Sequence, residues 1–161
     1  MSDSPEWLAD RLNSEGAKTL SFFQTLSDDQ WLVQVYEAGS CWSIEQVLSH
    51  FVSTEIGIHR LIRDILSGGE GAAEDFDIDR YNESSVNKTR DRSRQEQLRE
   101  FHLRRGENVE MVRQMSPGDL LLSGRHPFLG WTQIEEIVKL LYRHNQIHIR
   151  DIRRVIAERS I

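Results

Sequence analysis

The feature that most constrains the fold of this chain is a long helical pattern from about Thr132 to Arg159. Residues four apart lie on one face of a helix, so His144 and His148 fall on the same face. The residues that share this face are apolar, whereas the opposite face carries lysine and arginine. The apolar members are Ile137, Leu140, Leu141, Ile152 and Val155. A helix of this kind must bury its apolar stripe against other elements, and the two histidines extend that stripe.

Three other segments show the same periodicity, at about residues 5–25, 44–66 and 94–115. Each follows a serine that suits the N-cap position, and two of these serines start capping boxes. Similar boxes begin at Ser27, predicting a short helix through about Tyr36, and at Thr132, where the last helix should start. With only three prolines, these signals predict an all-α protein. Its expected form is a four-helix bundle with long connections and one short extra helix.

Two segments lack this pattern and are expected to be connections. Residues 69–92 are polar and acidic, but Phe76, Ile78 and Tyr81 could pin this segment across the bundle. Residues 120–130 cannot be helical around Pro127. There is no internal repeat or low-complexity tract, so residues 1–161 are expected to form one domain.

Composition excludes several classes of protein. A net charge of −6 argues against binding nucleic acid by neutralising phosphates. The basic end of the last helix contains Asp151 and Glu158 among its arginines, which favours a solvated face with local ion pairs. The sequence contains no run of about 18 apolar residues, so no membrane span is expected. The polar start of the chain lacks the regions of a signal peptide, and Cys41 is the only cysteine, so a cytoplasmic location is expected.

His144 and His148 suggest a metal site, because two bare imidazoles in an apolar setting would otherwise cost free energy. The alternative is a pair satisfied by water and backbone carbonyls. His50 lies at the edge of the apolar stripe of the second long helix and completes a triad if that helix neighbours the last one. Three histidine ligands leave a position open on a divalent metal, where a water or thiol could be activated.

Short motifs along nearly the whole chain resemble the DinB/YfiT-like metal-binding four-helix bundles. The motifs are Trp42-Ser43 at a helix start, Ser49-His50, His144-x-x-x-His148, Arg125-His126-Pro127 with Leu129-Gly130, the segment 76–82 and His148-Ile149-Arg150-Asp151-Ile152. The resemblance implies a divalent metal, zinc or nickel, held by His50, His144 and His148. It also implies homodimers, and activities such as transfer of low-molecular-weight thiols or hydrolysis. A separate C-terminal thiol-recognition domain, as in the mycothiol-dependent isomerases, has no counterpart here.

Four further residues are candidates for the pocket or for contacts to the ligands. His126 could donate a proton or contact a substrate, or it could simply be held by the turn at Pro127. Tyr81 and Asn82 could cover the open face of the metal, or Asn82 could anchor a loop. Asp151 could orient an imidazole, although pairing with a neighbouring arginine is favoured.

These features leave two functions open, and the catalytic residues cannot be assigned from them. One is a metal-dependent enzyme that activates a thiol or water for transfer to, or hydrolysis of, a small-molecule substrate. The other is a non-catalytic bundle that binds a small molecule or partner, with a structural or vestigial metal. A third function, DNA-damage-related nucleic-acid binding, fits the acidic charge poorly.

Overall fold

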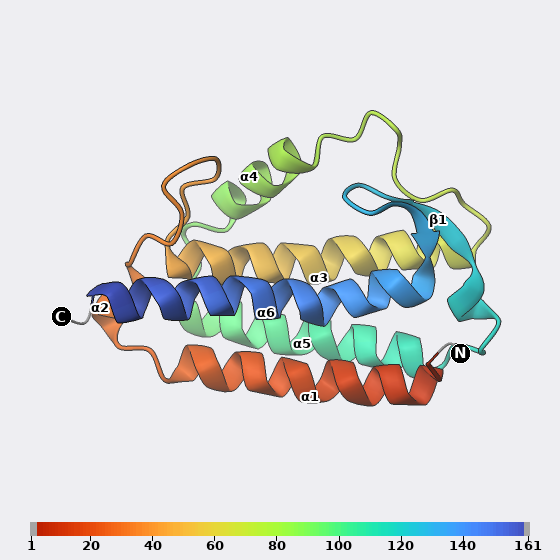
Figure 1. Cartoon of the computed structure of the whole chain (residues 1–161), viewed down its shortest axis with the longest axis horizontal. Helices are drawn as coiled ribbons and strands as arrows, with labels where there is room; N and C mark the ends of the chain where they lie inside the picture. Colours follow the sequence, from red (N-terminus) through yellow and green to blue (C-terminus); the bar gives the residue numbers. More distant parts are fainter. Residues whose placement is uncertain (1–2, 160–161) are drawn as a thin grey trace.

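The computed structural model describes residues 3–159, and its main body is a four-helix bundle (Figure 1). The long helices are α1 (Pro5–Gln24), α3 (Ile44–Leu66), α5 (Arg94–Arg113) and α6 (Ile134–Arg159). Both α1 and α3 pack against α5 and α6, which places α1 and α3 at opposite corners. In Figure 1, α3 and α5 run in one direction and α1 and α6 in the other. The expected fold class is confirmed, and none of the described helices is long and apolar enough to cross a membrane.

The helix starts follow the capping signals except at α6, and the helix that starts after Ser27 ends earlier than predicted. Ser4 accepts a hydrogen bond from the Trp7 amide, and Ser43 and Ser93 complete capping boxes. The box at Ser27 opens only a four-residue helix, α2 (Asp28–Trp31), so the predicted extension to Tyr36 is wrong. The predicted cap at Thr132 is also wrong, because Thr132 lies in a β-strand and α6 begins at Ile134.

Residues 32–43, called the α2–α3 loop below, fold back on themselves, and the part around Val33 and Val35 pairs with the chain that enters α3. The Val35 amide donates to the Trp42 carbonyl at 2.8 Å, and the Ile44 amide donates to the Val33 carbonyl at 2.9 Å. Gly39 adopts a φ of 69°, a conformation that other residues rarely tolerate, and thereby lets the loop reverse.

The two long connections also contain structure that the sequence analysis did not predict. Helix α4 (Ile78–Lys88), capped by Asp77, packs on α3 within the connection at 69–92. After a 3-10 turn, η1 (Asp119–Leu121), strands β1 (Ser123–His126) and β2 (Gly130–Gln133) form an antiparallel hairpin before α6. The Ala72 amide donates to the Arg125 carbonyl at 2.8 Å, which joins the two connections.

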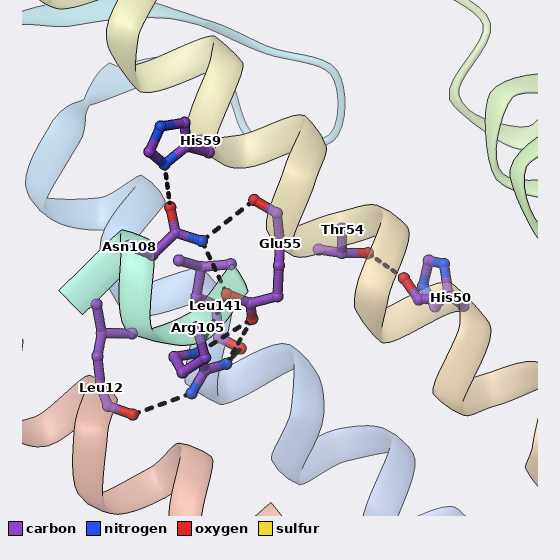
Figure 2. A network of polar contacts seen from close by, with 8 residues as sticks. All are labelled: Leu12, His50, Thr54, Glu55, His59, Arg105, Asn108 and Leu141. Carbon is purple, nitrogen blue, oxygen red and sulfur yellow. Dashed lines mark hydrogen bonds and ion pairs between the residues drawn. The ribbon is translucent and has the colours of Figure 1, made fainter. Parts of the chain in front are cut away.

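The bundle interior consists of two apolar clusters with polar residues between them. The first cluster includes Leu12, Ile58, Val109 and Leu141, and the second includes Phe23, Phe51, Phe101 and Ile149. Between them lies a polar layer, formed by Glu55, His59, Arg105 and Asn108 (Figure 2). Gly16 makes room for it, since a Cβ there would lie 2.8 Å from Cγ of Arg105.

Candidate metal centre

The structure brings together the three histidines that the sequence singled out. His50 lies on α3, and His144 and His148 lie one turn apart on the neighbouring α6. The Nε2 atom of His144 is 2.8 Å from Nε2 of His50 and 3.1 Å from Nε2 of His148. These residues, the histidine cluster, are the one group of metal-ligand type found among residues 3–159.

Burial keeps the rings of the cluster neutral. His50 is only 5% exposed and packs against Trp42, whereas His144 and His148 remain partly exposed. Burial lowers the pKa of His50 well below its ordinary value, and the two neighbouring imidazoles lower it further. Burial also lowers the pKa of His144 to about 3 and that of His148 to about 4. At neutral pH the three rings therefore offer lone pairs, which a metal ion requires.

The tautomer of His148 is set by two residues on its other side. The Tyr36 hydroxyl donates to Oδ2 of Asp151 at 2.9 Å, and its oxygen lies 2.6 Å from Nδ1 of His148. A carboxylate only accepts, so the single hydroxyl proton points to Asp151 and the hydroxyl oxygen accepts from Nδ1–H. Nε2 of His148 then carries the lone pair that faces the cluster. The other carboxylate oxygen of Asp151 lies 3.9 Å from Arg150 and 4.0 Å from Arg154.

The donor set fits a divalent metal ion of the first transition row. Three imidazole nitrogens about 2.1 Å from one ion lie roughly 3.4 Å apart in tetrahedral geometry, so small ring shifts from the 2.8 and 3.1 Å found here would admit an ion. The Nδ1 atoms of His50 and His144 are buried and have no hydrogen-bond partner among the described residues. If these Nδ1 atoms carry the ring protons, the Nε2 lone pairs of both rings are free to face one ion.

His126 lies at the end of β1, a strand that contacts α6, and is 7% exposed. Its Nδ1 accepts hydrogen bonds from the amides of Phe128 and Leu129 at 3.0 and 3.1 Å, so the turn at Pro127 does hold this ring. Burial lowers its pKa to about 4. The neutral ring must carry its proton on Nε2, which has no hydrogen-bond partner in the described chain. A charge on His126 would lower the pKa of His144.

Tyr81 and Asn82 lie on α4, above α3 rather than against the histidines. The Tyr81 hydroxyl would be 3.4 Å from a Cβ at Gly57, two helical turns beyond His50. Asn82 makes no side-chain hydrogen bond with any residue in the described range 3–159. An open groove of about 1410 Å³ lies between α3 and α5, away from α4, and none of the cluster histidines lines it. Within residues 3–159, no hydrogen bond or ring contact joins Tyr81 or Asn82 to the cluster histidines.

Sequence analysis missed two sets of residues around the cluster. Tyr36 escaped notice because it was assigned to the end of a helix. The polar layer also escaped, although its signal was present: Arg105 lies midway between the inward residues Phe101 and Val109, four residues from each. Glu55 likewise follows Phe51 by four residues. A charged residue at an inward position of an apolar stripe predicts a buried ion pair.

Comparisons with known proteins agree with the architecture. The model of the DinB superfamily matches residues 11–152. A search of curated proteins gave no match. Among solved structures, the chain is similar to YfiT from Bacillus subtilis, described as a probable metal-dependent hydrolase with an unusual four-helix bundle topology. That similarity has a TM-score of 0.78 at 15% identity and covers 96% of this chain and 86% of the other.

Proposed function

This chain belongs to the DinB superfamily, and we propose that it binds a divalent metal ion through His50, His144 and His148. The observation that carries the proposal is the convergence of three neutral Nε2 atoms from two rigid helices. Zinc and nickel are the ions we favour, since imidazole suits both. The histidines come from α3 and α6, whose packing sets their spacing before any ion binds.

We propose further that the site is catalytic. Three protein ligands leave a coordination position free, whereas structural zinc sites usually have four. A bound metal supplies Lewis acidity that lowers the pKa of a water or thiol. The partial exposure of His144 and His148 gives a small molecule access, while Trp42 and Phe51 exclude water from the other side.

His126 is the residue we propose as the hydrogen-bond donor to the substrate. Its Nδ1 is committed to the turn, so its Nε2–H is held in a fixed direction away from that turn. A fixed donor near a metal can stabilise negative charge on a reacting oxygen or sulfur without reorganising. Hydrolysis of a small electrophile, or its transfer to a thiol, would both use this arrangement. The description of YfiT as a probable metal-dependent hydrolase supports hydrolysis first.

The test is the metal content of untagged protein by plasma mass spectrometry. We expect about one zinc or nickel ion per chain in the parent, and none in His144→Ala. His102→Ala is the matched control, because His102 is an exposed histidine outside the cluster, on α5. Metal-free parent protein, even after reconstitution with both ions, would contradict the proposal. If the parent binds metal, esters should be screened for metal-dependent hydrolysis, and thiols with electrophiles for metal-dependent transfer.

The alternative, a non-catalytic bundle that binds a small molecule, has one observation in its favour. Among residues 3–159, no carboxylate makes a direct contact with the cluster histidines, and Asp151 reaches His148 only through Tyr36. If the metal-loaded protein binds small molecules but shows no turnover with water or thiols, this alternative replaces the catalytic one.

A further inference from the structure

The α2–α3 loop lies outside the four-helix bundle, yet it contacts two of the three cluster histidines. The Trp42 ring is 4.6 Å from the His50 ring, and the Tyr36 hydroxyl reaches His148. The loop is anchored by the hydrogen bond between Val35 and Trp42, whose side chains are 6% and 5% exposed. Tyr36 is thus presented to the cluster from a fixed backbone position.

Tyr36 has the chemistry to fix both the rotation and the tautomer of the His148 ring. Its hydroxyl is shared between Nδ1 of His148 and Oδ2 of Asp151 at 2.6 and 2.9 Å. A tyrosine hydroxyl is protonated at neutral pH, and here it donates its single proton to Asp151. His50 and His144 have no comparable contact, since their Nδ1 atoms lack partners in the described chain.

We propose that Tyr36 is a positioning residue for the metal site, holding His148 with Nε2 toward His50 and His144 and linking its ring to Asp151. This inference rests on the metal binding proposed above. The carboxylate, acting through the hydroxyl, makes His148 the more basic ligand, as carboxylates beside metal-bound histidines commonly do. The three ligands are therefore unequal, and His148 is the one whose orientation is set before metal binds.

The proposal is tested by the zinc affinity of Tyr36→Phe, measured by competition with a chromophoric chelator. Loss of such a contact typically weakens metal binding about 10- to 100-fold, and we expect that range here. Asp151→Asn should weaken binding to a similar extent. The double variant should lose little more than either single one, because both residues act through one chain of hydrogen bonds.

Tyr142→Phe is the matched control, since Tyr142 is a buried tyrosine of α6 whose hydroxyl makes no hydrogen bond within residues 3–159. Its zinc affinity should equal that of the parent. A second readout is the long-range ¹H–¹⁵N spectrum of zinc-loaded protein, where the Nδ1 proton of His148 should exchange slowly in the parent and faster in Tyr36→Phe.

Three outcomes would decide against the proposal. Zinc affinity of Tyr36→Phe within twofold of the parent would overturn the positioning role while leaving the metal site intact. Equal losses in Tyr36→Phe and Tyr142→Phe would assign the effect to general destabilisation. A parent that binds no zinc or nickel would overturn both this inference and the proposed function.

Discussion

Helix α3 carries His50 and Glu55, two buried polar residues five positions apart. The hydrogen bonds of Glu55 are satisfied within the protein, whereas His50 faces two other neutral imidazoles. In the polar layer, Arg105 donates to both carboxylate oxygens of Glu55 and to the carbonyls of Leu12 and Leu141. Asn108 donates to the Glu55 carboxylate and accepts from Nδ1 of His59. In the histidine cluster, by contrast, three neutral rings face one another with no opposite charge in direct contact.

The difference separates a polar layer that is structural from the cluster for which we propose metal binding. The polar layer is complete within the protein and joins all four long helices, so it fixes how they align (Figure 2). In the histidine cluster the three Nε2 atoms face one another, and rings with their protons on Nδ1 turn three lone pairs toward one point. Three converging lone pairs repel one another unless a cation or a proton lies between them.

The largest effect on stability is expected in the polar layer, and its absence would remove the contrast with the histidine cluster. Arg105→Met leaves the carboxylate of Glu55 buried without its cation, which typically costs about 3–5 kcal/mol. Urea unfolding of the metal-free protein measures this loss. The control is Arg104→Met, which removes partly exposed pairs with Glu100 and Glu107 and should cost less than about 1 kcal/mol. Equal losses in the two variants would remove the contrast.

Lowering the pH should destabilise the folded protein through the histidine cluster. The folded pKa of His148 is about 4, below the ordinary 6.5, so the unfolded chain binds protons at higher pH than the native one. Stability is then fully present above pH 6.5 and declines as the pH falls toward 4, by about 3 kcal/mol for one such histidine. Urea midpoints between pH 7 and 4.5 should fall less in His148→Leu than in the parent. His102→Leu should behave as the parent, and parallel curves for all three would contradict the prediction.

The smallest change in stability is expected for a substitution in the histidine cluster itself. In metal-free protein at pH 7, His144→Leu should change the free energy of unfolding by about 1 kcal/mol or less in either direction. The substitution removes an unsatisfied buried polar atom and keeps an apolar side chain in its place. Urea unfolding checks this, and a loss above about 3 kcal/mol would mean that the cluster is structural, like the polar layer.

The long helices were predictable because their signals are local. Capping boxes and apolar stripes lie within one segment, so Ser43 and Ser93 marked the starts of α3 and α5. The hairpin was not predictable, because its strands are short and β1 depends on residues far away, such as Ala72. Helix α4 escaped because its composition is polar and only Val86 is buried.

The same distinction holds for the site. His144 and His148 share a helix, so their proximity followed from spacing, and His50 needed only the assumption that α3 and α6 are neighbours. Tyr36 could not be inferred, because its position depends on a loop reversal at Gly39 and on pairing between Val35 and Trp42. Contacts made by extended loop segments cannot be predicted from the helical spacing of apolar residues.

The contact between the rings of Trp42 and His50 makes Trp42 fluorescence a test of metal binding. An indole ring 4.6 Å from a cluster histidine lies within the range where a paramagnetic ion quenches fluorescence, whereas zinc does not quench in this way. Nickel binding should therefore dim the emission of Trp42, and the protein would report the identity of its ion without any added dye. The remaining tryptophans, Trp7, Trp31 and Trp131, lie in other surroundings and would supply an internal reference for the signal.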